Sequence, residues 1–228
     1  MLRLIKDSEA RIDKMLSLSK SPYLALSFGK DSIVMWDLVR KQKPDIKCLF
    51  LTDTETFMMF EYEELIKHYK NNYSINLEVI RTDTLAENNY NLDKARDARR
   101  ANWYLPQFIN KDGVFMGLRI EESKARRMTL LKKENNQIGR FIMQYKTGKR
   151  AGQYRCCPVA DWASADILTY CKMNNLKLLG IYEQGNHIRT TARIPRDEKR
   201  ANALNWIRIS NPQKYQLLKN MIPELQYL

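Results

Sequence analysis

The sequence lacks any long uninterrupted apolar run. No stretch approaches the about eighteen residues that a membrane-spanning helix needs. The opening stretch MLRLIKDSEARIDK carries charges where a secretion signal would have its apolar segment. We therefore expect a protein that does not bind membranes and is located in the cytoplasm. The apolar fraction of 44% over 228 residues is sufficient for one sizeable core.

Cysteine is scarce, and its spacing excludes the common metal motifs. The chain has four cysteines, Cys48, Cys156, Cys157 and Cys171, and no CxxC pair. This spacing favours neither a zinc site nor an iron–sulfur cluster held within the chain, and it predicts no disulfide framework. Cys48 lies in the apolar run IKCLFLTD and is expected in the core.

The adjacent pair Cys156 and Cys157 has two interpretations. Basic neighbours lower the pKa of a thiol and favour the thiolate, so the pair is a candidate sulfur relay. The alternative is plain packing beside Pro158. The basic neighbours in question are Lys149, Arg150 and Arg155.

Acidic residues are sparse in the second half of the chain. Residues 1–114 hold 18 Lys and Arg against 17 Asp and Glu, whereas residues 115–228 hold 21 against 9, so the net charge of +13 is almost wholly C-terminal. A one-sided basic surface suits a polyanionic partner, and DNA is the expected one; a merely solvated basic face is the alternative. The candidate contacts are Lys149, Arg150, Arg155, Arg189, Arg193, Arg196, Lys199 and Arg200. Aromatic residues near a basic run, Trp103, Tyr104 and Phe108, are expected in the core, with base stacking as the alternative.

Buried apolar runs alternate with helical spacing in the first half of the chain. This alternation predicts a parallel sheet flanked by helices. The expected strands are 21–28, 46–54, 75–83 and 113–119, and the expected helices include 2–18, 31–43, 57–71 and 121–131. The polar stretch that follows, up to residue 155, is expected to be a mobile loop or hairpin. A helix near 161–175 and a terminal helix near 211–225 complete the pattern.

The loop SFGKDS separates the first strand from the next helix. We expect Gly29 to take a positive φ and let backbone N–H groups approach an anion, while Lys30 supplies charge. Ser27 and Ser32 supply hydroxyls, and the following helix offers its positive end. Diphosphate is the ligand that this combination favours. The loop is not a Walker A motif, because Asp31 follows the lysine; an ordinary turn is the alternative interpretation.

Three motifs together resemble a known family. SFGKDS resembles the PP-loop of the N-type ATP pyrophosphatases. GLRIEESKARR resembles the G-x-R-x-x-E-S-x-x-R element of their phosphoadenosine phosphosulfate (PAPS) reductase branch, and CPVADWASADILTYCKMNNL resembles that branch's Pro, Trp, Asp and Tyr segment. The resemblance covers about residues 22–180. It implies an α/β, adenine-nucleotide α-hydrolase-like (Rossmann-like) fold that binds ATP or a sulfated adenylate, with Mg²⁺ in the ATP-cleaving members.

The resemblance also implies a set of site residues. The phosphates would be held by Ser27, Phe28, Gly29, Lys30, Asp31 and Ser32. The second wall would be formed by Gly117, Arg119, Glu122 and Ser123, together with either Arg126 or Arg127. Lys30, Asp31 and Arg119 are the expected catalytic residues. Asp53 is a candidate for a different reason, because it ends the second expected strand at the same rim: it would bind the ribose or, with Asp31, a magnesium ion, or else cap a helix. Glu122 would line the site or orient a neighbouring arginine.

The sequence also departs from its relatives. PAPS reductases use a cysteine in a Glu-Cys-Gly-(Leu or Ile)-His setting, and this sequence has no cysteine after Cys171. Adenylylsulfate reductases carry cluster cysteines in an Arg-Thr-Gly-Cys-x-x-Cys-Pro-like segment, whereas the nearest stretch here is RTTARIP, at residues 189–195. We therefore expect ATP and Mg²⁺ as cofactors and no iron–sulfur cluster.

The preferred hypothesis is an ATP pyrophosphatase. It would cleave ATP to AMP and pyrophosphate and adenylate an oxygen for sulfur insertion, in DNA phosphorothioate modification, beside a cysteine desulfurase or other sulfur donor and DNA-processing partners. One alternative is a sulfate-assimilation enzyme, either PAPS reductase-like or an ATP sulfurylase subunit. The other is a nucleotide-binding or nucleic-acid-binding module without turnover. We expect residues 1–180 to form the α/β domain and residues 181–228 a basic C-terminal extension, helical and loop-like, packed on it.

Overall fold

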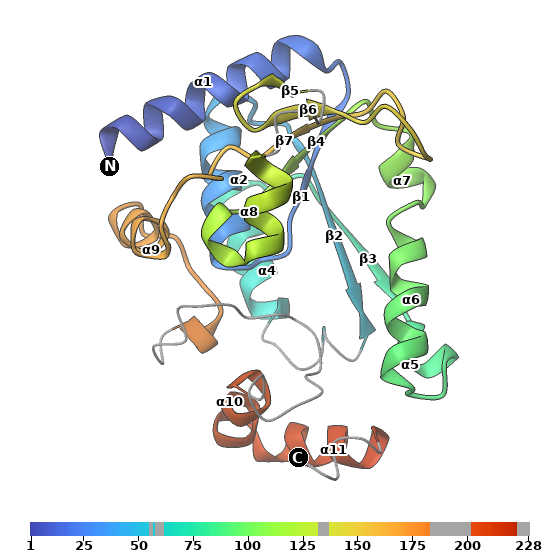
Figure 1. The fold of residues 1–228 in the computed structure, drawn as a ribbon. Coiled ribbons are helices and arrows are strands. Elements are labelled where there is room, and N and C mark those ends of the chain that lie inside the picture. Colours follow the sequence, from blue (N-terminus) through green and yellow to red (C-terminus); the bar gives the residue numbers. More distant parts are fainter. Residues whose placement is uncertain (55–56, 58–61, 132–136, 183–201, 223–228) are drawn as a thin grey trace.

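A seven-stranded sheet organises the chain. The computed structural model describes residues 1–54, 57, 62–131, 137–182 and 202–222 (Figure 1). The strand order is β3-β2-β1-β4-β7-β6-β5. The strands are β1 (Pro22–Ala25), β2 (Lys47–Asp53), β3 (Leu77–Thr82), β4 (Gly113–Met116), β5 (Gln137–Gly139), β6 (Ile142–Gln144) and β7 (Tyr154–Cys156). The first four and β7 are parallel, and β5 and β6 join antiparallel at one edge.

Helices connect the strands and flank the sheet on both faces (Figure 1). The longer described helices are α1 (Leu2–Leu18), α2 (Lys30–Gln42), α4 (Tyr62–Tyr73), α6 (Leu92–Asn102), α8 (Lys124–Leu131), α9 (Ser164–Met173), α10 (Asn202–Ser210) and α11 (Pro212–Met221). Short helical turns are α5 (Thr84–Glu87), α7 (Pro106–Ile109), η1 (Ile120–Glu122) and η2 (Gly180–Tyr182). The predicted α/β fold with a mostly parallel sheet flanked by helices is therefore confirmed.

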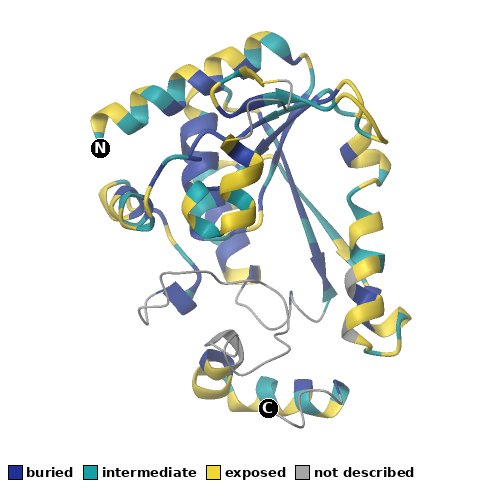
Figure 2. Ribbon diagram, in the orientation of Figure 1, coloured by how far each residue is buried: buried dark blue, intermediate teal, exposed yellow. Residues whose placement is uncertain are grey.

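The central strands β1, β2 and β4 are largely buried, which explains their nearly continuous apolar sequences. Alternate residues point to opposite sides: Leu24 and Phe50 join the main core with α1, α2, α4 and α9, whereas Tyr23 and Leu49 face α7. Figure 2 shows the same pattern, with a dark β2 and a dark α2 inside lighter surface helices. The main core is the largest of three buried clusters among the described residues, and it includes most of the buried side chains of α2, which pack this helix against the sheet.

The strand order identifies where a ligand is expected. The chain moves from β1 to β2 and β3 on one side, and β4 then pairs with β1 on the other side. Such a reversal opens a crevice at the carboxyl ends of the strands, which is the usual ligand site of open α/β sheets. The loop SFGKDS follows β1 at this point and leads into α2.

The second half of the chain agrees only in part with the sequence-based predictions. The polar stretch of the second half contains the hairpin β6 to β7, which extends the sheet. The single expected terminal helix is preceded by a further helix, α10, which the sequence pattern did not predict. The proposed boundary at residue 180 stays a prediction. Within the described ranges, none of the helices combines the length and the apolar character needed to cross a bilayer.

Candidate nucleotide-binding site

The backbone of the loop differs from expectation at its glycine. Gly29 has a φ of −70°, and it is Phe28 that adopts the left-handed conformation, with a φ of 54°. The Phe28 ring is buried, and its centroid lies 5.2 Å from that of Phe50 and 6.3 Å from that of Tyr62. This aromatic packing holds the side chain inward and compensates for an unfavourable backbone conformation. The expected positive φ at Gly29 is therefore wrong, and Phe28 offers the site only its backbone.

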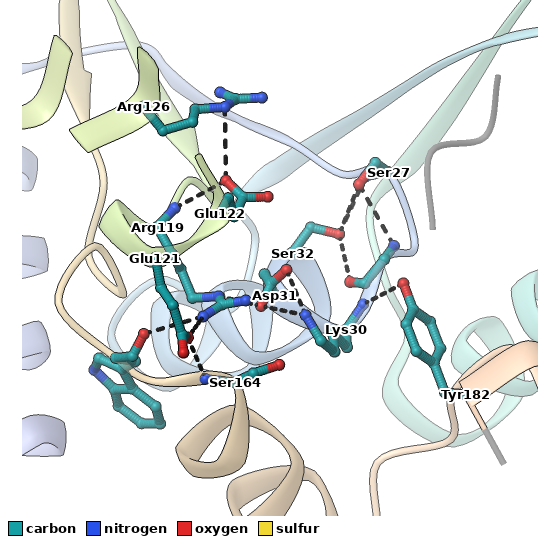
Figure 3. Close-up of polar contacts among 12 residues, drawn as sticks. Ser27, Lys30, Asp31, Ser32, Arg119, Glu121, Glu122, Arg126, Ser164 and Tyr182 are labelled. Carbon is teal, nitrogen blue, oxygen red and sulfur yellow. Dashed lines mark hydrogen bonds and ion pairs between the residues drawn. The ribbon is translucent and has the colours of Figure 1, made fainter. Parts of the chain in front are cut away.

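Two serine hydroxyls close the loop on itself. Ser32 Oγ donates to the carbonyl of Gly29 at 2.9 Å, and Ser27 Oγ donates to Ser32 Oγ at 3.1 Å (Figure 3). Ser27 is exposed, whereas Ser32 is buried beneath it. Together they fix the start of α2, whose first-turn N–H groups have no acceptors within the helix itself. This geometry is typical of an anion cradle at a helix N-terminus.

Three charged side chains converge beside the loop. Lys30 Nζ lies 3.0 Å from Asp31 Oδ2, and Arg119 Nε lies 2.6 Å from Asp31 Oδ1 (Figure 3). Both cations are almost fully buried, with Lys30 2% exposed and Arg119 1% exposed. Burying a charge is costly unless it is paired, so Asp31 is what allows both cations to lie here. All three expected catalytic residues are thus brought together.

Glu121 is a further member of this cluster that the sequence analysis missed. Its carboxylate accepts from Arg119 at 2.7 Å and from the backbone N–H of Ser164 at 2.7 Å. The hydrogen bond from Arg119 lowers the pKa of Glu121. Burial alone would lower the pKa of Arg119, but the carboxylates of Asp31 and Glu121 reverse this effect and raise it. The carbonyl of Trp162 also accepts from this guanidinium, at 3.2 Å.

Gly117 is required by a close approach of two backbones. A Cβ at this position would lie 2.9 Å from both N and Cα of Ser32. Real side chains do not tolerate such contacts with backbone, so only glycine lets the end of β4 pack against the first turn of α2. This packing positions Arg119, two residues further on. Gly117 therefore shapes the second wall of the site by its lack of a side chain.

The rest of the second wall is a tightly bonded turn. Glu122 accepts from the backbone N–H of Arg119 at 3.1 Å and pairs with Arg126 Nε at 3.6 Å. Ser123 Oγ accepts from the backbone N–H of Arg126 at 3.1 Å. Arg127 is exposed. Glu122 thus orients the turn and Arg126, which is one of the two roles expected for it.

Tyr182 is a second residue that the sequence analysis missed. Its hydroxyl accepts a hydrogen bond from the backbone N–H of Lys30 at 3.3 Å (Figure 3). The side chain is buried, and it reaches the loop from η2, 152 residues further along the chain. No motif surrounds it, so only the folded structure connects it with the site.

Asp53 lies at the end of β2, close to the carboxyl edge of the sheet. It forms an ion pair with Arg99 of α6 and accepts from Thr82 Oγ1 at 3.1 Å. Burial raises the pKa of Asp53, and the charge of Arg99 opposes that shift. Asp31 and Asp53 are thus each paired with cations of the protein. Among the described residues, no three His, Cys, Asp or Glu side chains gather where they would hold a metal ion.

The cysteine pair lies in a different environment from the one expected. Cys156 and Cys157 are both fully buried. Burial raises the pKa of Cys157 to about 11 and that of Cys156 well above its usual value. The expectation that basic neighbours would favour a thiolate is therefore wrong, because desolvation outweighs the nearby charges.

The basic candidates fall into two groups. Lys149, Arg150 and Arg155 lie in and after the loop that joins β6 to β7. The remaining five lie outside the described residues: Arg189, Arg193, Arg196, Lys199 and Arg200. Of the three aromatic residues, Phe108 is in the core as expected, Trp103 is half-buried, and Tyr104 is 42% exposed.

The chain is similar in sequence to enzymes of sulfate metabolism. It is 28% identical over 177 residues to a phosphoadenosine 5'-phosphosulfate reductase of Vibrio parahaemolyticus, a match covering 70% of this chain and 60% of the relative. With the corresponding Buchnera aphidicola protein the identity is 28%, over 78% of this chain and 72% of the relative. The chain thus spans less than two thirds of the length of the Vibrio protein. These names agree with the sulfate-assimilation alternative better than with the preferred ATP pyrophosphatase.

Solved structures share the fold at lower identity. A PAPS reductase from Candida auris, in complex with phosphate, has a TM-score of 0.56 at 15% identity over 78% of this chain and 85% of the other. The U34-tRNA thiolase NcsA from Methanococcus maripaludis has a TM-score of 0.54 at 16% identity over 99% of this chain and 80% of the other, and it contains a [4Fe-4S] cluster. The expected cofactor set of ATP and Mg²⁺ without an iron–sulfur cluster is therefore corrected. A protein with this fold, NcsA, contains a cluster. The sequence relatives are named for a sulfonucleotide and not for ATP.

A family model covers most of the site. The model of the phosphoadenosine phosphosulfate reductase domain matches residues 21–215, which include the SFGKDS loop, the second wall and the segment around Trp162. The match extends over far more than half of the chain. This protein therefore belongs to the phosphoadenosine phosphosulfate reductase domain family.

Proposed function

We propose that the chain binds an adenosine sulfonucleotide, either PAPS or adenylylsulfate, and acts in the reduction of its sulfate group. The observation that carries this proposal is the pair of buried cations, Lys30 and Arg119, held by Asp31 at the N-terminus of α2. A phosphosulfate is a compact dianionic group, and the helix N-terminus with two nearby cations is complementary to it. The family and the names of the sequence relatives support the same substrate class.

The site residues have distinct roles in this proposal. Backbone N–H groups of the loop and Lys30 would bind the phosphate, while Arg119 would stabilise the charge that develops on the leaving nucleotide. Asp31 and Glu121 hold the Arg119 guanidinium from two sides, so its direction is fixed before the substrate binds. Preorganised donors of this kind stabilise a developing charge most strongly where water is excluded. Asp31 is accordingly a positioning residue.

In this proposal the attacking thiol comes from another molecule. All four cysteines of the sequence are buried, and burial raises the pKa of each one. In the proposed reaction, a thiolate of a dithiol protein attacks the sulfate sulfur and the sulfur–oxygen bond to the phosphate breaks. The nucleotide leaves with both electrons of that bond. The second thiol then attacks the first sulfur, which releases sulfite and leaves a disulfide.

Binding calorimetry tests the substrate class. PAPS, adenylylsulfate, AMP and ATP are titrated in turn into the wild-type protein, the Lys30→Ala variant and the Lys172→Ala variant. Lys172 is an exposed lysine of α9 and serves as the matched control. We expect a sulfonucleotide to bind more tightly than AMP or ATP, with an affinity about tenfold or more lower in Lys30→Ala and unchanged in Lys172→Ala. Absence of sulfonucleotide binding to the wild type would overturn the proposal.

Cleavage of ATP to AMP and pyrophosphate is the competing function. One observation favours it: adenylation needs no cysteine, and the buried thiols of this chain are poorly suited to attack. Tighter binding of ATP than of either sulfonucleotide, followed by appearance of AMP and pyrophosphate, would replace the first proposal with this one. ADP and phosphate as products would contradict both.

A further inference from the structure

The loop between β6 and β7 lies at the end of the sheet opposite to the nucleotide site. Tyr154, the first residue of β7, pairs with Gly113, the first residue of the parallel strand β4, so the loop before it is at the amino ends of the strands. SFGKDS lies at their carboxyl ends. In Figure 1 the loop runs beside α7, far along the sheet from α10 and α11. A ligand on this loop would therefore not occupy the nucleotide site.

The conformation of this loop is well defined. Arg150 donates from its guanidinium to the carbonyl of Trp103 at 2.9 Å, and Gln153 Nε2 donates to the carbonyls of Phe108 and Lys111, both at 2.9 Å. Within the loop, the N–H of Gly152 donates to the carbonyl of Tyr145 at 2.8 Å. These bonds attach the loop to the segment between α6 and β4. Its side chains therefore form a preformed surface.

The segment from β5 into β7 carries a net positive charge. Residues 137–155 contain five Lys and Arg and no Asp or Glu. Arg140 pairs with Asp161 at 3.3 Å. No carboxylate among the described residues pairs with Lys149, Arg150 or Arg155. Lys149 is exposed, whereas Arg150 and Arg155 are half-buried. Cations without carboxylate partners attract a polyanion, whose bound counterions are released on binding.

Two tyrosine rings alternate with these cations. Lys149 Nζ lies 5.3 Å from the centroid of Tyr104, and the Arg150 guanidinium lies 6.0 Å from the centroids of both Tyr104 and Tyr145. Arg155 lies 5.8 Å from the centroid of Tyr145. Arg150 is thus close to both rings. Tyr104 is 42% exposed, which leaves much of its side chain open to a planar partner. We call these five residues the hairpin surface.

We propose that the hairpin surface binds single-stranded nucleic acid. Proteins that bind single strands combine cations that follow the phosphates with aromatic rings on which bases stack. The hairpin surface has both kinds of side chain, with each cation close to a tyrosine ring. An acidic peptide would satisfy the cations but make no use of the exposed Tyr104 ring. A duplex hides the faces of its bases, so the rings favour a single strand. The proposal stands independently of the sulfonucleotide.

Fluorescence anisotropy with labelled oligonucleotides tests the proposal. Oligo(dT) and oligo(U) of about twelve nucleotides, a length within the usual site sizes, are titrated into the wild type and into the Tyr104→Ala, Tyr104→Phe and Lys149→Ala variants. We expect about fivefold or greater weakening for Tyr104→Ala, because a base loses its stacking partner, and near wild-type binding for Tyr104→Phe. Lys149→Ala should weaken binding and reduce its dependence on salt by about one phosphate contact.

The controls separate this surface from general basicity. Lys172→Ala removes another exposed lysine, on α9, and should leave binding unchanged. Thermal melting checks that each variant is folded, and both Tyr104 and Lys149 are exposed, so little destabilisation is expected. A higher affinity for one of the two oligonucleotides identifies DNA or RNA as the ligand. Equal binding by wild type and Tyr104→Ala, or displacement by polyglutamate of matched charge as effectively as by unlabelled oligonucleotide, would overturn the proposal.

Discussion

Arg119 Nε and Asp31 Oδ1 lie 2.6 Å apart, although the two residues are 88 positions apart in the sequence. This contact joins the turn after β4 to the first turn of α2, and it brings the second wall of the site to the loop. Asp31 also holds Lys30, so one carboxylate orients two buried cations. Loss of that carboxylate should therefore lower both the stability of the protein and its affinity for the nucleotide.

Asp31→Asn should destabilise the protein by about 3 kcal/mol and weaken sulfonucleotide binding. The amide keeps the shape of the side chain but leaves Lys30 and Arg119 as buried cations without their shared partner, and breaking such a pair is strongly unfavourable. Urea denaturation measures the stability. Asp13→Asn, which neutralises an exposed carboxylate on α1, is the control and should change the unfolding free energy by less than about 0.5 kcal/mol. Equal effects of the two substitutions would contradict the account of Asp31.

Gly117→Ala should cost about 1 to 3 kcal/mol and lower nucleotide affinity. The added Cβ would meet the backbone of Ser32 at 2.9 Å, so the turn that carries Arg119 has to move away from α2. Denaturation and calorimetry on the same preparation measure the two effects. The matched control is Gly139→Ala, because a Cβ there meets only side chains, the nearest being Lys14 at 3.6 Å. A variant with wild-type stability and affinity would show that the close approach is unimportant.

Arg99→Ala should destabilise the protein more at pH 7 than at acidic pH. Burial already raises the pKa of Asp53, and removal of Arg99 would raise it further. A carboxyl with a raised pKa in the folded state loses stabilisation as the pH rises through that pKa. The difference from wild type should therefore be about 1 to 3 kcal/mol at neutral pH and should shrink as Asp53 becomes protonated. Denaturation across pH 4 to 7 measures it.

Arg100→Ala is the control for the Arg99 experiment. Arg100 is exposed and pairs only with an exposed carboxylate, Asp97, among the described residues. Surface ion pairs contribute little, so this variant should follow the wild-type pH profile closely. A pH-independent loss in Arg99→Ala would assign the effect to packing and not to Asp53.

The four thiols should react slowly with iodoacetamide in the native protein at pH 8. Burial raises the pKa of Cys157 to about 11 and those of Cys48 and Cys171 to about 12, so the reactive thiolate is a very small fraction. Because these pKa values are raised in the folded state, stability should also fall as the pH rises above the ordinary thiol value. Mass spectrometry before and after denaturation counts the modified thiols. Rapid native alkylation of Cys156 or Cys157 would restore the sulfur-relay hypothesis.

The local parts of the site could be predicted from the sequence. Strand β1, its loop and α2 follow one another within about twenty residues, so the pattern of apolar residues, glycine and lysine locates them. The motif at 117–127 likewise identified Arg119 and Glu122. The left-handed conformation of Phe28 could not be predicted, because it depends on packing against Phe50 and Tyr62.

Long-range contacts explain the other differences. Tyr182 is far from Lys30 in the sequence, and only folding brings its hydroxyl to the backbone N–H of Lys30. Glu121 and Glu122 are adjacent, and the sequence does not show which of the two carboxylates pairs with the Arg119 guanidinium. For Cys156, the neighbours in sequence suggested a low pKa, but its thiol faces α1, where Sγ lies 3.7 Å from the carbonyl of Arg11. Burial by a distant helix therefore outweighs charge nearby in the sequence.

Product analysis is the most direct test of the central claim. The protein is incubated with PAPS or adenylylsulfate and a dithiol protein, and in parallel with ATP, and the products are separated by ion-exchange chromatography. The account predicts sulfite and the desulfated nucleotide, in amounts that match the disulfide formed, with loss of turnover in Lys30→Ala. AMP and pyrophosphate from ATP, without sulfite from either sulfonucleotide, would contradict it.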